Sequence, residues 1–229
     1  MSHLYRFPSI LLASTSPRRR ALVSRFSFPV LTCRPQGNEE PADSHEVPLD
    51  YVERMARLKA MSTSKIRGHE ELVIGADTIV VSESLIFGKP SDANHAIDML
   101  NSLRNKTHQV FTSIAIVLPG EKGLFLETSI VSVTMRDYSY NEIKSYVKTG
   151  DSMDKAGSYA IQDQRFHPVK EFNGCYNSVL GLPLCVLSSL LEKSGFITDK
   201  DECGSGVDAK DFIPSTFAGN EVSYECGSS

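Results

Sequence analysis

Residues 73–81 place the strongest limit on what this chain can fold into. Apart from Asp77 and Thr78, the run is uncharged and rich in β-branched residues, which is typical of a strand buried on both faces. A carboxylate inside such a strand is costly to bury without compensation. We therefore expect Asp77 to face a water-filled cleft, or to be compensated by cations and a metal. The alternative is a turn that merely interrupts the strand.

A cluster of arginines lies at the start of the first predicted helix. Ser16 is a typical N-cap residue and Pro17 suits the first helical position, so a helix is predicted from there to about residue 25. Its first turn contains Arg18, Arg19 and Arg20. Cations are unfavourable at this end of the helix dipole unless an anion binds there. The hydroxyl-rich loop before the helix therefore favours a phosphate site, although a solvated basic turn would give the same sequence.

Two separate lysines are further candidates for binding an anion. Residues 48–65 have helical periodicity, and Lys59 falls inside the apolar sector of that helix. Its ammonium group would either extend past the apolar side chains to the surface or reach an anion in a cleft. Lys89 lies between Gly88 and Pro90, on a loop whose backbone is restricted.

The remaining pattern predicts an α/β protein. Further strands are expected at residues 9–13, 28–32, 109–118, 125–135 and 169–172, with a hairpin return at 82–87. Further helices are expected from a Ser91 cap to Leu103, after a capping box of Ser139 and Glu142, and after Pro183. We expect one domain over residues 1–197 and a polar, flexible tail over residues 198–229.

The composition excludes several classes of protein. The formal net charge of −4 gives no electrostatic basis for nucleic acid as a bulk partner. The five cysteines are scattered and include no C-x-x-C pair, which argues against a disulfide framework and for a reducing compartment. No apolar run approaches the length of a membrane span, and the N-terminus lacks the apolar segment of a secretory signal. We therefore expect a cytoplasmic protein whose partners include neither nucleic acid nor a membrane.

Several short motifs occur in a consistent order along the chain. They are Leu12-Ala13-Ser14-Thr15-Ser16-Pro17-Arg18-Arg19, Lys59-Ala60, Gly75-Ala76-Asp77-Thr78, Gly88-Lys89-Pro90, Asp154-Lys155-Ala156-Gly157-Ser158-Tyr159-Ala160-Ile161-Gln162 and Gly181-Leu182-Pro183-Leu184. With these motifs the chain resembles, from about residue 10 to residue 191, the Maf family of nucleoside triphosphate pyrophosphatases. The resemblance implies an elongated mixed β-sheet with flanking helices and two lobes around a cleft, as in the inosine-triphosphate pyrophosphatases.

The resemblance also implies roles for individual residues. It implies Asp77 as the general base, and around the triphosphate it places Ser14, Arg18, Arg19, Lys59 and Lys89. The positions that distinguish members acting on dTTP and UTP are matched by Arg18, Thr78 and Gln162. The implied cofactor is a divalent metal, Mg²⁺ or Mn²⁺, with Asp77 and Glu39 as ligands. The acidic loop is one residue longer here, so Glu40 is an alternative to Glu39.

The activity that the resemblance implies is hydrolysis of dTTP, UTP or modified pyrimidine triphosphates to the monophosphate and pyrophosphate, which cleans the nucleotide pool. The alternative is a non-catalytic nucleotide-binding regulator of cell division. Residues 163–168, Asp-Gln-Arg-Phe-His-Pro, depart from the glycine-rich turn that family members usually have after the glutamine, which leaves substrate breadth open. A homodimer is left open as well.

Overall fold

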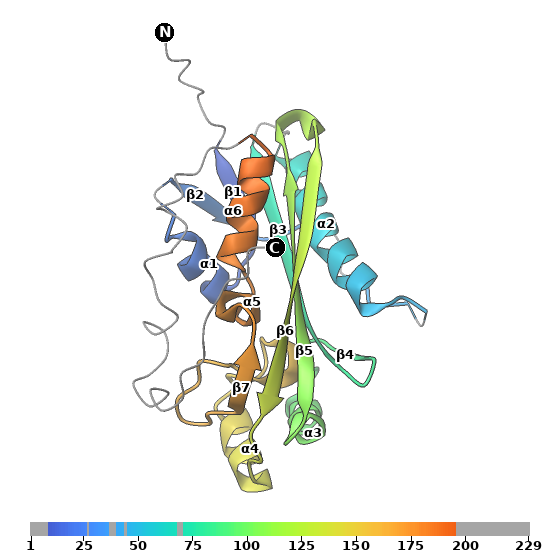
Figure 1. The fold of residues 1–229 in the computed structure, drawn as a ribbon, viewed down its shortest axis with the longest axis vertical. Helices are drawn as coiled ribbons and strands as arrows, with labels where there is room; N and C mark the ends of the chain where they lie inside the picture. The colour runs from blue at the N-terminus through green and yellow to red at the C-terminus, as the bar shows by residue number, and fades with distance from the viewer. Residues whose placement is uncertain (1–8, 27, 37–39, 44, 68–70, 196–229) are drawn as a thin grey trace. The chain divides into compact units, whose positions relative to one another are not determined.

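The computed structural model describes residues 9–26, 28–36, 40–43, 45–67 and 71–195. The strands, labelled in Figure 1, are β1 (Ile10–Ala13), β2 (Val30–Cys33), β3 (Leu72–Ser82), β4 (Leu85–Phe87), β5 (Thr107–Val117), β6 (Leu124–Met135) and β7 (Val169–Asn173). The helices are α1 (Pro17–Val23), α2 (Pro48–Ile66), α3 (Ala93–Leu103), α4 (Tyr140–Lys148), α5 (Tyr176–Leu180) and α6 (Leu184–Lys193), with two short 3-10 helices, η1 (Pro119–Glu121) and η2 (Ala156–Ser158). The predicted tail at residues 198–229 lies outside the described residues.

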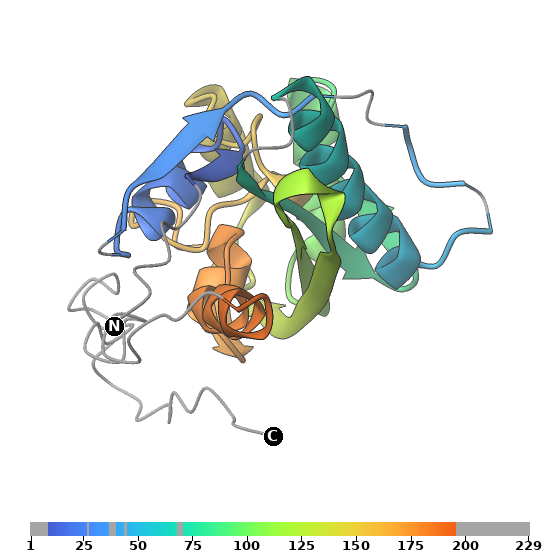
Figure 2. The ribbon, with the colours of Figure 1, turned by 90° about the horizontal axis from the view of Figure 1, so that it is seen from above.

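The seven strands of the described residues form one mixed sheet. Its order is β2-β1-β3-β5-β6-β7, and β4 pairs with β3 beside this path. β1 is parallel to both β2 and β3, whereas the β3–β4 and β6–β7 pairs are antiparallel. α1 is the crossover between β1 and β2 and lies beside them in both views (Figures 1 and 2). The predicted α/β class, with a mixed sheet and helices, is confirmed.

The chain divides into two compact units, each assembled from separated segments. The first contains the described residues up to Asp77, then Ser113–Thr128 and α6; the second contains Thr78–Thr112 and Ser129–Pro183. Each of the strands β3, β5 and β6 belongs to one unit at one end and to the other unit at the other end. The boundary therefore separates Asp77 from its neighbour Thr78.

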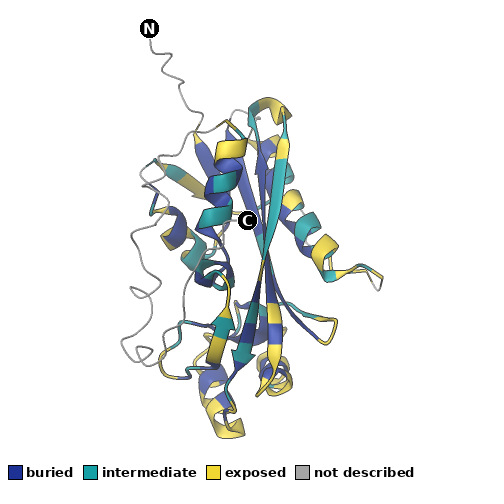
Figure 3. Cartoon of the chain, viewed as in Figure 1, coloured by how far each residue is buried: buried dark blue, intermediate teal, exposed yellow. Residues whose placement is uncertain are grey.

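β3 is the buried strand that the sequence predicts. Of its eleven residues, all are buried except Asp77 and Thr78 (Figure 3). Ile74, Ala76 and Ile79 have almost no exposed surface, in keeping with a strand that is covered on both faces. The strand continues through the polar pair, so the alternative of a turn at Asp77 is excluded.

The backbone of β3 approaches α2 closely at Gly75. A Cβ atom at this position would lie 2.4 Å from the carbonyl oxygen of Ala56 and 2.5 Å from the backbone nitrogen of Ala60. Both alanines are fully buried, one turn apart on α2. A glycine facing two alanines therefore allows the strand and the helix to be in backbone contact at this level.

The predicted helix starts are confirmed for α1 and α4 and corrected for α3. Ser16 caps α1, and Ser139 forms the capping box of α4 with Glu142. The cap of α3 is Asp92 instead of the predicted Ser91, whose hydroxyl donates to Asp92 at 2.9 Å. Both residue types suit an N-cap, and the carboxylate takes the position. The sequence did not predict α5, which is too short for its periodicity to be recognised.

His108 of β5 is buried against Tyr159, which follows η2. Its Nε2 atom lies 2.8 Å from the hydroxyl oxygen of Tyr159, and the two rings meet edge to face. Its Nδ1 atom is buried with no hydrogen-bond partner among the described residues. Burial lowers the pKa of His108 from 6.5 to about 4, because the imidazolium form would lose its hydration.

We expect this histidine to make folding stability depend on pH. As the pH falls from 6.5 toward 4, the unfolded chain binds a proton at His108 and the folded chain does not, so the free energy of unfolding decreases. Between about pH 7.5 and pH 5 the decrease should be about 2 kcal/mol larger in the wild type than in His108→Gln. Urea unfolding at both pH values measures it, with His45→Gln, at an exposed histidine, as the control. An equal decrease in wild type and His108→Gln would contradict the prediction.

The described residues bear on the expectations about membrane spans and cysteines. Within them, no helix is both long and apolar enough to cross a membrane. Among the described cysteines, Cys33, Cys175 and Cys185 are free thiols.

Candidate active site

Asp77 is compensated by Lys59 of α2. The Nζ atom of Lys59 donates to Oδ1 of Asp77 at 2.6 Å. The side chains are 9% and 15% exposed, so the pair is mostly shielded but not sealed from water. The ammonium group of Lys59 is therefore directed to the carboxylate of Asp77 instead of to the surface.

α1 brings an arginine to the same stretch of β3. The guanidinium of Arg19 donates to the carbonyl oxygen of Ala76 at 2.8 Å, one residue before Asp77. Arg18 is half-buried in the same helical turn. Ser14 is buried directly after β1, the strand paired with β3, and its Oγ accepts a hydrogen bond from the loop backbone at 3.2 Å. The first unit thus brings two of the predicted cations, Arg19 and Lys59, to residues 76 and 77 of β3.

Thr78 belongs to the second unit and contacts other hydroxyl groups. Its Oγ1 lies 3.0 Å from Oγ1 of Thr112, and Thr112 donates from that atom to the carbonyl oxygen of Ser178 at 2.8 Å. A threonine hydroxyl has one proton, so Thr112 must accept in its contact with Thr78. The proton of Thr78 is therefore directed to Thr112, and its oxygen can only accept from any further partner. Sequence reasoning missed Thr112 and Ser178 because both are distant from Thr78 along the chain.

The second unit also holds Lys89 and Gln162. The carbonyl oxygen of Gly88 accepts from the backbone N–H of Gly157 at 3.1 Å, which ties the Lys89 loop to η2. η2 lies in the segment that ends at Gln162. Lys89 is exposed and Gln162 is half-buried, so both side chains are accessible.

Lys155 stabilises the turn before η2, a role that sequence reasoning missed. The side chain is buried, and its Nζ lies 2.6 Å from Oδ1 of Asp154 and 3.0 Å from Oδ1 of Asp151. The same Nζ donates to the backbone carbonyl of Asp151. The spacing of Asp151 and Lys155, four residues apart in a polar stretch, is the signal that could have identified the pair.

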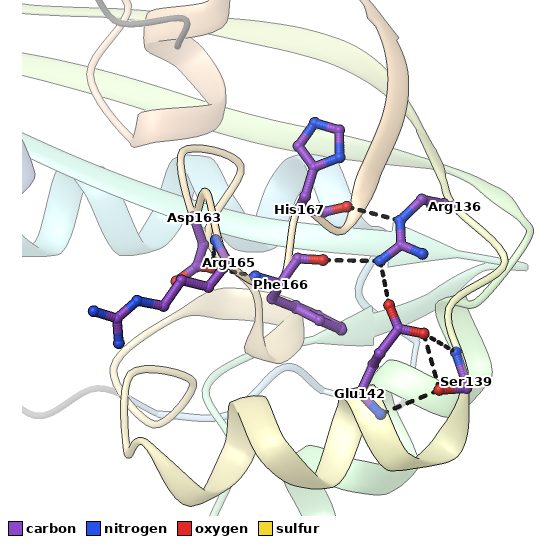
Figure 4. Close-up of polar contacts among 7 residues, drawn as sticks. All are labelled: Arg136, Ser139, Glu142, Asp163, Arg165, Phe166 and His167. Carbon is purple, nitrogen blue, oxygen red and sulfur yellow. Dashed lines mark hydrogen bonds and ion pairs between the residues drawn. The ribbon is translucent and has the colours of Figure 1, made fainter. Parts of the chain in front are cut away.

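Residues 163–168, where the sequence departs from the family pattern, form a compact turn (Figure 4). Oδ1 of Asp163 accepts hydrogen bonds from the backbone N–H groups of Phe166 and of the residue before it, at 2.6 and 3.0 Å. The ring of Phe166 is buried, stacks on Tyr146 with the centroids 4.5 Å apart, and contacts Tyr138. The turn is therefore anchored at Asp163 and at Phe166.

Arg136, the residue directly after β6, holds the far end of this turn (Figure 4). Its guanidinium donates to the carbonyl oxygens of Phe166 at 2.9 Å and His167 at 3.0 Å. The same group pairs with Glu142 at 2.7 Å. The chain that follows Gln162 is thus fixed by hydrogen bonds to its backbone and needs no glycine-rich sequence.

The predicted metal ligands are only partly covered by the described residues. Glu39 lies outside them, and Glu40 is exposed. Within the described part of the chain, no three His, Cys, Asp or Glu side chains are grouped so that they could hold a metal. Mg²⁺ is commonly bound by one or two carboxylates and completes its shell with water and substrate phosphates. Asp77 fits such a site, in which a nucleotide supplies the remaining ligands.

Comparison with known proteins places the chain in a family. The family model of the Maf-like protein matches residues 9–194. A dTTP/UTP pyrophosphatase of Dehalococcoides mccartyi is 39% identical over 189 residues, which cover 82% of this chain and 84% of the relative. The dTTP/UTP pyrophosphatases of Photorhabdus laumondii and Dictyoglomus turgidum are each 40% identical, over 83% and 82% of this chain and 96% of either relative. By its sequence over nearly all of the described residues, the chain belongs to the Maf-like protein family.

Proposed function

We propose that this protein is a nucleoside triphosphate pyrophosphatase that hydrolyses dTTP and UTP to the monophosphate and pyrophosphate. The observation that supports this most directly is the pairing of Asp77 with Lys59, next to the guanidinium of Arg19. Relatives at 39 to 40% identity are named dTTP/UTP pyrophosphatases, which supports the same activity. In this proposal the protein acts in the cytoplasm and cleans the nucleotide pool, including modified pyrimidine triphosphates.

The chemistry requires a proton acceptor and positive charge. Attack of water on the α-phosphate needs a base, and the departing pyrophosphate needs compensating cations. Asp77 accepts the proton of the water, and the triphosphate is bound by Ser14, Arg18, Arg19, Lys59 and Lys89. A divalent metal, Mg²⁺ or Mn²⁺, held by Asp77 and Glu39, would neutralise charge on the phosphate oxygens. No covalent nucleophile is required.

Recognition of the base is assigned to Thr78 and Gln162, together with Arg18. Thr78 can only accept from the substrate, since its proton is directed to Thr112. The amide of Gln162 can donate to a pyrimidine carbonyl and accept from the ring N–H. Uracil and thymine offer this combination of a ring N–H beside two carbonyl groups.

The test is nucleotide hydrolysis with Mg²⁺ or Mn²⁺, with the products resolved by chromatography. We expect dTTP and UTP to yield the monophosphate and pyrophosphate. Release of orthophosphate from the γ position, with no pyrophosphate, would contradict the proposal. Binding without turnover across a full panel of nucleotides would favour the non-catalytic regulator instead.

Gln162→Glu is expected to shift the base preference. An ionised glutamate can only accept, so it loses the bond to a pyrimidine carbonyl but suits the N–H-rich edge of guanine. The ratio of kcat/KM for UTP to that for 7-methyl-GTP should fall more than about tenfold, because the pyrimidine carbonyl is left without its hydrogen-bond donor. Gln164→Glu, at an exposed glutamine in the same loop, is the matched control. An unchanged ratio in Gln162→Glu would move base recognition to Arg18, Thr78 or the 163–168 turn.

A further inference from the structure

The ion pair between Lys59 and Asp77 occupies the carboxylate that the proposed reaction needs. We propose that Lys59 is an exchangeable counter-ion. Without a nucleotide it neutralises Asp77, and a bound triphosphate draws it away, so that Asp77 becomes available to metal and water only when substrate is present. This inference rests on the proposed function and adds the order in which the charges exchange.

Geometry and charge make the two states of Asp77 compete. The ammonium group lies 2.6 Å from Oδ1 of Asp77. A divalent cation bound to the same carboxylate would lie close to that ammonium group, and the two like charges would repel each other strongly in a site shielded from water. The carboxylate therefore serves Lys59 or the metal, but not both fully at once.

The lysine side chain is suited to this exchange. Its ammonium group is a compact charge on a flexible four-carbon stem, so it can turn between two anions without movement of the helix backbone. The close contact of α2 with β3 at Gly75 fixes where that stem begins. A triphosphate has several negative charges whereas Asp77 has one, so the ammonium group moves to the triphosphate when both are present.

The metal ligands among the described residues also support this exchange. No three metal-ligating side chains come together in the part of the chain that the structure describes, so a metal held by Asp77 and Glu39 still needs further ligands to complete its shell. The phosphate oxygens supply further ligands and also remove Lys59 from Asp77. Metal and triphosphate therefore strengthen each other's binding, and this coupling must be reciprocal.

The first experiment measures Mn²⁺ binding to the protein alone, by electron paramagnetic resonance of the free ion. We expect Lys59→Met to bind Mn²⁺ about tenfold more tightly than the wild type, a coupling of ordinary size for interacting sites. The gain should disappear in the double variant Lys59→Met/Asp77→Asn. Lys65→Met, which removes an exposed lysine of the same helix, should bind like the wild type.

Several outcomes of this experiment would overturn the inference. Equal Mn²⁺ affinity in wild type and Lys59→Met is one, and a gain that persists in the double variant is another. If Lys59→Met does not fold, Lys59→Gln replaces it, because its amide is polar like the ammonium group but carries no charge. Lys59→Gln is then expected to bind Mn²⁺ about tenfold more tightly than the wild type. Equal affinity, or a gain that persists when Asp77→Asn is added, would overturn the inference.

The second experiment uses no metal. With EDTA present, α,β-imido-dUTP should bind Asp77→Asn several-fold more tightly than the wild type, because Lys59 is no longer held by a carboxylate. Equal or weaker binding by Asp77→Asn would overturn the exchange. A wild type that neither binds this analogue nor hydrolyses any triphosphate would refute the proposed function, and the Mn²⁺ measurement would still decide the role of Lys59.

Discussion

Replacing Asp77 with asparagine is expected to lower the hydrolysis of dTTP and UTP at least about a hundredfold, the usual scale for loss of a general base. The substitution is nearly isosteric and removes only the charge and the capacity to accept a proton. Asparagine keeps the shape of the Asp77 side chain at the single interruption of β3, so the fold should persist. The effect should appear in kcat, because the water is no longer activated.

The measurement is steady-state hydrolysis of UTP with Mg²⁺, with a thermal melt to show that the variant is folded. Affinity for the nucleotide should change far less than the rate, since Arg19 and Lys59 are still present to bind the triphosphate. Asp98→Asn, at an exposed aspartate of α3, is the control and should hydrolyse at the wild-type rate. Activity of Asp77→Asn within a few-fold of the wild type would move the base elsewhere, with Glu39 as the first residue to examine.

Gly75→Ala is expected to have the largest effect on stability. The added methyl group would lie 2.4 Å from the oxygen of Ala56 and 2.5 Å from the nitrogen of Ala60, and both are backbone atoms that cannot rotate away. α2 must then move off β3, which costs about 3 kcal/mol and should lower the Tm by roughly 10 °C. The same movement displaces Lys59, which the proposed function places on the triphosphate, so hydrolysis should also decrease.

Calorimetry of two further variants separates this clash from the general effect of adding a methyl group. Gly88→Ala should keep the wild-type Tm, because a Cβ atom there has nothing within 4 Å. Adding Ala60→Gly to Gly75→Ala should not restore stability, because the closest atoms belong to the helix backbone. A Tm of Gly75→Ala equal to that of the wild type would show that α2 can shift at no cost.

The parts of the fold that could be predicted are those encoded locally. The uncharged run of β3 with its polar pair, the Ser16 cap of α1 and the capping box at Ser139 each depend on a few consecutive residues, and each is confirmed. The position of Lys59 in the apolar sector of α2 also followed from local periodicity. The partner of Lys59 could be identified only from the folded structure, because Lys59 and Asp77 lie 18 residues apart in the sequence, on α2 and β3.

The parts that could not be predicted depend on contacts between distant segments. The hydroxyl chain from Thr78 through Thr112 to Ser178 joins residues 34 and 66 positions apart. The guanidinium of Arg136 reaches a turn that begins more than two dozen residues later, and no local pattern marks it. The cap of α3 was misassigned by one residue because Ser91 and Asp92 are both good caps.

The way Arg136 holds the 163–168 turn has a consequence for how the substrate range of this protein can evolve. Arg136 contacts three successive backbone carbonyls, with its guanidinium on Phe166 and His167 and its own N–H on Pro168 at 2.8 Å. Every amino acid has the same carbonyl group, so these bonds do not depend on which side chains the turn presents. The exposed residues 164 and 165 can therefore be substituted close to Gln162 while the backbone stays in place, so new nucleotide preferences can be tried at little cost to the fold.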